Sequence, residues 1–187
     1  MKSICVYCGS SASNEPAYIE AGKNLGKLLG ESGQRLVYGG ASIGIMGTIA
    51  DATLEAGGEV LGVMPNSLVE LEVQHEGLTE LIVVDSMHER KAKMVEQSEG
   101  FIALPGGFGT LDELFETLTW AQLGYHDKPV GVLNVDGYFD ALFEFLSNAV
   151  AKALIKQKHL DMLHVASNSE ALLAEMAKYE APMIAKV

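Results

Sequence analysis

Short apolar runs alternate with longer amphipathic stretches along the whole chain. The apolar runs predict strands at residues 3–7, 35–38, 60–64, 81–84, 100–104, 130–133 and 164–166. The amphipathic stretches predict helices at residues 16–29, 45–56, 87–97, 110–123, 138–154 and 169–178. Short apolar strands that alternate with helices are typical of parallel sheets covered on both faces. The pattern therefore predicts an α/β fold with a doubly wound, mostly parallel sheet and helices on both faces.

The length of the chain predicts a single domain over residues 1–187, because 187 residues suffice for one buried core and are few for two. No apolar run approaches the roughly 18 residues of a membrane span, and the chain begins directly with a strand-like run. A soluble cytoplasmic protein with no membrane contact is expected. The net charge of −12 disfavours nucleic acid as a partner, because such proteins need a basic surface. A phosphorylated ligand should therefore meet locally concentrated cations.

The two cysteines, Cys5 and Cys8, have the CxxC spacing of some redox proteins. Redox motifs of this kind lie at the start of a helix, where the dipole lowers the thiol pKa. Here Cys5 lies inside a predicted strand and Cys8 at its end, so the two side chains should leave on opposite faces. Small buried core residues are the preferred interpretation.

The sequence PGGFGTLDE at residues 105–113 follows an apolar strand and opens an amphipathic helix. Three glycines within four positions let the backbone approach a ligand closely, and the first amides of a helix have no partner within it. A strand, a glycine turn and a helix N-terminus in this order suit a phosphate group.

The predicted helix after this turn carries one apolar stripe at i, i+3, i+4 and i+7 spacing, made of Leu111, Leu114, Phe115 and Leu118. Glu113, Glu116 and Trp120 fall on the opposite side. Glu113 would then lie beside a ligand held by the glycine turn. A structural alternative stays open: Thr110 and Glu113 also fit a capping box, in which case Glu113 would only cap the helix.

Two other predicted strands end in glycine-rich segments, CGSS at residues 8–11 and YGGASIGIMG at residues 38–47. In doubly wound sheets, ligands bind beyond the carboxyl ends of the strands. Three glycine turns at one edge of the sheet therefore predict a ligand site there.

The fourth strand is followed by DSMHERK at residues 85–91, in which Ser86 and Glu89 fit a capping box. Arg90 and Lys91 come early in the next helix, where cations oppose the helix dipole. Departures from local rules often mark functional sites, so both residues are site candidates at the same sheet edge. The alternative is that both are solvated surface residues.

Several common motifs are absent from the sequence. There is no GxxxxGKS/T, which excludes a P-loop NTPase, and no GxGxxG follows the first strand, so the dinucleotide-binding fingerprint is missing. The five histidines show neither HExxH nor paired Cys/His spacing. The sequence therefore predicts no metal site.

These motifs together resemble the LOG (Lonely Guy) family, cytokinin riboside 5'-monophosphate phosphoribohydrolases that are often labelled in error as lysine decarboxylases. Residues 105–113 are similar to the PGGxGTxxE signature of that family. The similarity extends to residues 8–10, 38–47 and 87–91, in the family's order. One departure is Ala41, where many members have a third glycine.

The resemblance implies a Rossmann-like homodimer that hydrolyses the N-glycosidic bond of an adenosine 5'-monophosphate, typically one with an N6-prenyl group. The products would be the free base and ribose 5-phosphate, and no cofactor or metal would be needed. Arg90 and Glu113 would be the catalytic pair. The substrate-binding positions implied by the resemblance are Gly9, Ser10, Gly40, Glu72, Met87, Lys91, Pro105, Gly106, Gly107, Phe108, Gly109, Thr110 and Thr119. Trp120, a large aromatic on the polar side of its helix, fits a dimer surface or a core contact under a loop.

The residues agree with this chemistry. Cleavage of a C1'–N bond builds oxocarbenium character on the ribose, which a carboxylate such as Glu113 can stabilise or relieve by activating water. Arg90 could serve either the phosphate or the leaving base. Three alternatives stay open: a non-catalytic nucleotide or molybdenum-cofactor carrier, a pyridoxal-dependent lysine decarboxylase with Lys91 as the Schiff base, and glycine turns that are only turns.

Overall fold

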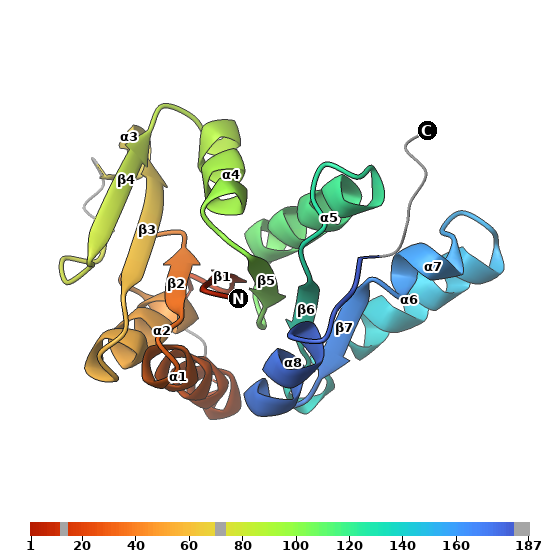
Figure 1. The fold of residues 1–187 in the computed structure, drawn as a ribbon, viewed down its shortest axis with the longest axis horizontal. Helices are drawn as coiled ribbons and strands as arrows, with labels where there is room; N and C mark the ends of the chain where they lie inside the picture. Colours follow the sequence, from red (N-terminus) through yellow and green to blue (C-terminus); the bar gives the residue numbers. More distant parts are fainter. Residues whose placement is uncertain (12–14, 70–73, 182–187) are drawn as a thin grey trace.

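The structure is a computed structural model that describes residues 1–11, 15–69 and 74–181. Its strands form one parallel sheet with the order β4-β3-β2-β1-β5-β6-β7 (Figure 1). The strands are β1 (Ser3–Tyr7), β2 (Arg35–Tyr38), β3 (Val60–Pro65), β4 (Glu80–Val84), β5 (Gly100–Ala103), β6 (Val130–Leu133) and β7 (Leu163–Ala166). The parallel pairing confirms the predicted doubly wound sheet.

Helices cover both faces of the sheet. They are α1 (Pro16–Glu31), α2 (Gly44–Glu55), α3 (Asn66–Val69), α4 (Met87–Glu96), α5 (Phe108–Gln122), α6 (Asp140–Ala151), α7 (Gln157–Leu160) and α8 (Ser169–Met176). Side chains of α1, α2 and α8 pack in one hydrophobic core, and those of α4, α5 and α6 pack in a second on the opposite face. Figure 1 shows the two groups of helices on either side of the strands.

Alternation along each strand divides its residues between these two cores. In β1, Ile4 and Val6 belong to the first core, whereas Cys5 and Tyr7 belong to the second. Cys8 lies in the first core, so the two cysteines do point to opposite faces, as predicted. Both are free and buried, and burial, followed by the charge of Glu113, raises the pKa of each thiol far above its ordinary value. Redox chemistry between them is excluded by this geometry.

The order of the strands reverses next to β1. The chain leaves β1 through α1 toward β2, on one side, and leaves β5 through α5 toward β6, on the other. β1 and β5 are paired, with Val6 opposite Ile102 and Tyr7 opposite Ala103. The loops after these two strands therefore separate toward opposite faces and leave a crevice, which is the usual ligand position in such sheets.

Several boundaries differ from the sequence prediction. Helix α5 begins at Phe108, two residues before the predicted start. The predicted helix at residues 138–154 is shorter in the structure, where α6 covers residues 140–151 and follows the short turn η1 (Val135–Gly137), in which Asp136 is left-handed. The four-residue helices α3 and α7 were not predicted, since four residues are too few to show a helical period.

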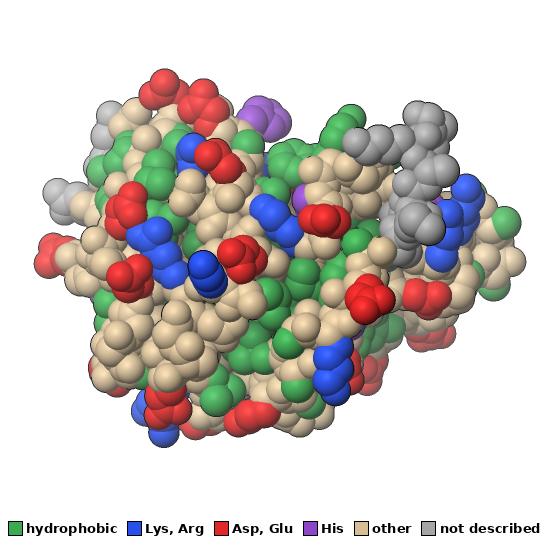
Figure 2. All heavy atoms as spheres, viewed as in Figure 1, with side chains coloured by type: hydrophobic (Ala, Val, Ile, Leu, Met, Phe, Trp, Pro, Cys, Tyr) green, Lys and Arg blue, Asp and Glu red, His purple; other side chains and the backbone are tan. Residues whose placement is uncertain are grey.

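Surface charge and helix length bear on the predicted partners. On the face in Figure 2, basic side chains lie scattered among acidic ones and form no large patch. Within residues 1–11, 15–69 and 74–181, no helix is both long enough and apolar enough to cross a bilayer.

Candidate active site

The glycine turn before α5 leaves the first amides of that helix open. Gly107 is the N-cap residue, with φ −89° and ψ −151°, and no side chain caps the helix. The amide of Leu111 donates to the Gly107 carbonyl at 3.2 Å, which is the first hydrogen bond of the helix. The amides of Phe108, Gly109 and Thr110 precede this bond and are available to an anion.

The predicted capping box at the start of α5 is wrong. Thr110 is the third residue of the helix rather than its cap, and its side chain is buried. Glu113 consequently lies nearly two turns inside the helix and has no open amide to cap. The capping box predicted before α4 is confirmed for Ser86, whose Oγ accepts from the Glu89 amide at 3.2 Å. In return, the Glu89 carboxylate accepts a hydrogen bond from the amide of Asp85, at 2.9 Å, rather than from that of Ser86.

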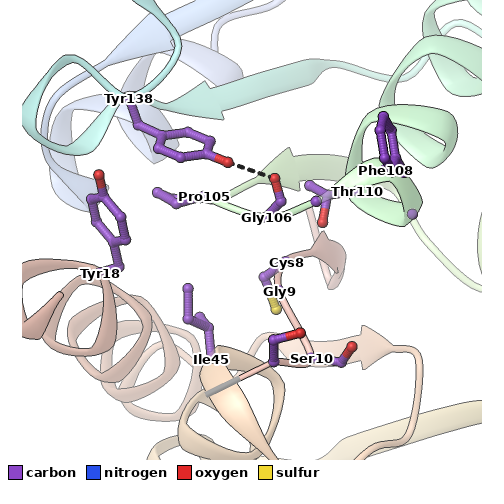
Figure 3. A pocket seen from close by; sticks show the side chains of 13 residues that line it. Cys8, Gly9, Ser10, Tyr18, Ile45, Pro105, Gly106, Phe108, Thr110 and Tyr138 are labelled. Atoms are coloured by element: carbon purple, nitrogen blue, oxygen red, sulfur yellow. Dashed lines mark hydrogen bonds between the residues drawn. The ribbon is translucent and has the colours of Figure 1, made fainter. Parts of the chain in front are cut away.

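A cavity of about 450 Å³ lies in the crevice between the loops after β1 and β5 (Figure 3). Its lining includes eight of the predicted substrate-binding residues, namely Gly9, Ser10, Pro105, Gly106, Gly107, Phe108, Gly109 and Thr110. Cys8, Ser11 and Ile45 also line it and belong to the glycine-rich segments predicted at this sheet edge, whereas the prediction missed Tyr18 and Tyr138. Tyr138 follows β6 and could have been found by collecting every segment after a strand; Tyr18, inside α1, gave no such signal.

The two loops touch directly beneath this cavity. The amide of Gly9 donates to the Pro105 carbonyl at 3.1 Å. A Cβ on Gly106 would lie 2.8 Å from the Gly9 nitrogen and would collide with the Thr110 side chain. Glycine is therefore required at position 106, because only a residue without a Cβ fits between the loop after β1 and the start of α5.

The cavity is not lined by cations. Its described lining contains backbone amides and hydroxyl groups, and neither arginine nor lysine is among these residues. The expectation that a phosphorylated ligand would meet concentrated cations is wrong for this cavity. Both predicted cations, Arg90 and Lys91, are instead already paired with carboxylates.

Arg90 is buried under the carboxyl ends of the strands, with 8% of its surface exposed. Its Nε donates to the Val63 carbonyl of β3 at 3.0 Å, and its Nη1 lies 3.4 Å from Oε1 of Glu113. Met87 Sδ lies 3.9 Å from the same Nη1. The alternative of a solvated surface arginine is therefore wrong.

Glu113 faces Arg90 from α5 and is 9% exposed. Burial raises the pKa of its carboxyl to about 7, although the charge of Arg90 acts in the opposite direction. The carboxyl therefore changes protonation state near neutral pH, which is the range in which an acid or base catalyst is most effective. Such an upward shift is common in active sites.

The predicted orientation of α5 is confirmed only in part, because Leu111, Leu114 and Leu118 pack against the second core but the fully buried side of the helix is a different one. Its buried residues are Thr110, Glu113, Leu114, Thr117 and Ala121. Apart from Leu114, the predicted apolar stripe of Leu111, Phe115 and Leu118 is only half-buried. The buried polar side chains of α5 have partners inside the protein. Thr117 Oγ1 and Tyr7 Oη are hydrogen-bonded at 2.8 Å, and Glu113 pairs with Arg90.

Lys91 joins α4 to α5. Its Nζ donates to Asp112 Oδ2 at 3.0 Å and to Glu116 Oε1 at 3.1 Å. Burial alone would lower the pKa of Lys91, but the hydrogen bonds to these two carboxylates outweigh it and raise the pKa. An ammonium group held in this way is poorly suited to form a Schiff base, which requires a neutral amine.

The remaining predicted positions lie outside the cavity. Gly40 has φ 85°, and its carbonyl accepts from the His75 amide at 2.8 Å. The departure at Ala41 leaves this turn intact, because the left-handed residue is Gly40. Thr119 lies on the outer side of α5, where its hydroxyl donates to the Phe115 carbonyl at 2.7 Å. Met87 is half-exposed beside Arg90, and Glu72 lies outside the described residues.

The fold and the site define a class of protein: a doubly wound α/β protein with an open helix N-terminus and a buried carboxylate–guanidinium pair near its switch point. In the described part of the chain, no group of three or more His, Cys, Asp or Glu side chains could hold a metal ion.

Comparisons with known proteins place the chain more closely. A family profile described as "Possible lysine decarboxylase" matches residues 46–176. The chain is 47% identical to "Cytokinin riboside 5'-monophosphate phosphoribohydrolase LOG5" of Arabidopsis thaliana, over 96% of this chain and 78% of that protein. It is also 47% identical to "Probable cytokinin riboside 5'-monophosphate phosphoribohydrolase LOGL1" of Oryza sativa subsp. japonica, over 94% of this chain and 79% of that one.

A similar solved structure is that of the molybdenum cofactor binding protein from Rippkaea orientalis. It has a TM-score of 0.71 and 26% sequence identity, and the match covers 95% of this chain and 96% of that one. The identity to the plant proteins is much higher and spans almost the whole chain. The chain belongs to the LOG family of cytokinin riboside 5'-monophosphate phosphoribohydrolases.

Proposed function

We propose that this protein, acting as a single domain, hydrolyses the N-glycosidic bond of adenosine 5'-monophosphates, including those with an N6 substituent. The products are the free adenine-type base, a cytokinin when the N6 group is prenyl, and ribose 5-phosphate. One observation carries the proposal: a buried Arg90–Glu113 pair lies on α4 and α5, and α5 also presents open amides to the cavity, in a chain 47% identical to named phosphoribohydrolases. A binding protein would need the amides and not the buried pair.

The open N-terminus of α5 supports a role in holding the 5'-phosphate. The amides of Phe108, Gly109 and Thr110 lie at the positive end of the helix dipole and line the cavity. Binding energy from a phosphate remote from the scissile bond can position the ribose for reaction. An unphosphorylated riboside should therefore be a poor substrate.

The Arg90–Glu113 pair supports hydrolysis at C1'. Water forms the new C1'–O bond, the C1'–N bond breaks with its electron pair going to the base, and the water proton ends on the base. Ionised Glu113 stabilises the oxocarbenium character of the ribose and orients the water. Arg90 stabilises charge on the departing base or on the phosphate. Lys91, Met87, Gly40, Thr119 and Glu72 remain proposed contacts of the substrate.

The outer surface of α5 supports a homodimer. Phe108 is 94% exposed, and it forms a shallow groove with the half-buried Leu111, Phe115 and Trp120. An exposed apolar groove of this kind favours contact with another protein surface. Light scattering coupled to size-exclusion chromatography should return about 40 kDa, twice the chain mass of 20.0 kDa, and a value of 20 kDa would reject the dimer.

A cytoplasmic location is part of the same proposal. The free thiols of Cys5 and Cys8 are compatible with a reducing compartment, in which unpaired cysteines are common. Fluorescence microscopy of a tagged chain in its host cell would test the location.

The first experiment incubates the protein with AMP and with N6-isopentenyl-AMP, and detects free base by chromatography. Wild type should release base from at least one of these nucleotides and much less from the matching ribosides. Glu113→Gln should bind the nucleotide and release base only at a small residual rate, far below that of wild type. Glu144→Gln, the same change at an exposed site on α6, should behave as wild type.

Other outcomes would assign other functions. Nucleotide binding without any base release by wild type would reject the hydrolase and favour a non-catalytic binding protein or carrier; the Rippkaea orientalis protein is named as a cofactor binding protein. Release of carbon dioxide from lysine would favour the decarboxylase description of the family profile. The ammonium state of Lys91 argues against that second outcome.

A further inference from the structure

The phenol of Tyr138 reaches from the loop after β6 to the glycine turn before α5. Its hydroxyl donates a hydrogen bond of 2.7 Å to the Gly106 carbonyl, drawn as the dashed line in Figure 3. This is a contact between two loops that follow neighbouring strands, β5 and β6. Tyr138 therefore ties the glycine turn to the next strand of the sheet.

The backbone before Tyr138 is shaped to aim this side chain. Asp136 and Gly137 are both left-handed, with φ of 49° and 71°. The first is strained for a residue with a side chain, and a Cβ at position 137 would lie 2.6 Å from Asp140 Oδ2. The Tyr138 ring packs edge-on against buried Phe139, with centroids 4.8 Å apart. The loop thus holds the phenol in one direction at the expense of local strain.

The bond acts on the peptide group that joins Gly106 to Gly107. A hydrogen bond to the carbonyl fixes the plane of that peptide and polarises it, which makes the N–H at its other end a stronger donor. Gly107 is the N-cap of α5 and lines the cavity. The Tyr138 hydroxyl therefore influences a group that faces the cavity without having to touch the ligand.

We propose that Tyr138 is a positioning residue for the 5'-phosphate, an inference that rests on the function proposed above. It acts through the Gly106–Gly107 peptide, where it orients and strengthens the Gly107 amide, a donor to the phosphate beside the open amides of Phe108, Gly109 and Thr110. The effect is large here because the described lining of the cavity contains neither arginine nor lysine. Amides and hydroxyl groups must compensate the negative charge of the phosphate, so the quality of each donor affects binding directly.

The ring of Tyr138 has a separate task. It meets Tyr18 of α1 edge-on, with centroids 5.4 Å apart, and both rings line the cavity in Figure 3. Tyr138→Phe keeps this aromatic wall and the contact with Phe139 and removes only the hydroxyl. The variant thus separates the hydrogen bond from the packing.

The test measures binding and turnover for this variant. We expect its affinity for ribose 5-phosphate, measured by isothermal titration calorimetry, to fall by about threefold to tenfold, the effect of one net hydrogen bond. KM for AMP should rise by a similar factor while kcat stays close to wild type, because the phosphate contact is made in both the ground and transition states. Affinity for free adenine, which has no phosphate, should not change.

Two further variants complete the test. Tyr125→Phe removes the hydroxyl of an exposed tyrosine just after α5 and should leave all four values unchanged. Gly137→Ala disturbs the loop that aims the phenol and should weaken ribose 5-phosphate binding in the same direction as Tyr138→Phe. Unchanged ribose 5-phosphate affinity in Tyr138→Phe, or an equal loss of adenine affinity, would overturn the proposal. The proposed hydrolase activity is tested separately, by base release from wild type. The ribose 5-phosphate titration measures binding without turnover, so its result does not depend on that activity.

Discussion

The Cα of Gly39, just after β2, lies directly against the guanidinium group of Arg90 on α4. A Cβ at position 39 would occupy the space of Arg90 Nη2. The glycine therefore makes room for the buried arginine, and the Val63 carbonyl and the Glu113 carboxylate hold the other nitrogens of the same group. Gly39 thus helps to set the position of a proposed catalytic side chain through packing alone, since a glycine has no side chain to bond to it.

Gly39→Ala should displace the Arg90 guanidinium and reduce kcat by about 100-fold, since a misplacement near 1 Å can have an effect of this size. Base release from AMP gives kcat, and circular dichroism verifies the fold. The matched control is a double-mutant cycle with Arg90→Ala. If Gly39 acts only through Arg90, Gly39→Ala should have no further effect in the Arg90→Ala background. Additive losses would contradict this relationship.

The raised pKa of Glu113 should make stability depend on pH. Its carboxyl titrates at about 7 in the folded protein, above the ordinary value of 4.5, so the folded state binds this proton more tightly. The stabilisation is complete below about pH 4.5 and is lost as the pH rises through 7. Glu113→Gln imitates the protonated form. Its free energy of unfolding, relative to wild type, should increase by about 2 kcal/mol between about pH 5 and pH 8.

Urea unfolding at several pH values measures this difference. The exposed Glu144→Gln provides the matched control and should show a constant difference from wild type across the same range. A difference for Glu113→Gln that stays flat or declines with pH would mean that the carboxylate is not disfavoured by burial.

The same titration of Glu113 should determine how the activity depends on pH. If ionised Glu113 stabilises the ribose cation and orients water, kcat for AMP rises with pH and levels off above about 7, because the carboxylate forms in that range. The residual activity of Glu113→Gln should lack this inflection. A rate that instead falls as the pH rises through 7 would assign Glu113 the opposite duty, that of an acid donating a proton to the base.

Lys91 should contribute to stability by linking α4 to α5. Lys91→Met removes two hydrogen bonds of a side chain that is 11% exposed, to Asp112 and Glu116, and should lower the free energy of unfolding by about 1–2 kcal/mol. Lys93→Met on the same helix removes a more exposed pair with Glu96 and should change it by less than about 0.5 kcal/mol. Equal effects of the two changes would mean that the Lys91 link is no stronger than a surface ion pair.

The helix α5 illustrates how far the sequence could be interpreted. Local pattern predicted the glycine turn, the helix that follows it and their place at the carboxyl ends of parallel strands. The structure has all three. The rotation of α5 was predicted only in part, because hydrophobic spacing assigned the buried side to Leu111 and Phe115. The helix buries Glu113 and Thr117 instead, since each finds a polar partner inside the protein.

The sequence by itself determined the order of strands and helices, the parallel sheet and the three glycine turns, because these depend on periods and turn residues within a few positions. It also placed Arg90, Lys91 and the glycine turn among the candidates. Only the tertiary structure decided the partners: Glu113 for Arg90, Asp112 and Glu116 for Lys91, and Gly106 for Tyr138. Each of these contacts joins residues more than 20 positions apart on different elements. Their geometry follows from how the helices lie on the sheet, which no local pattern records.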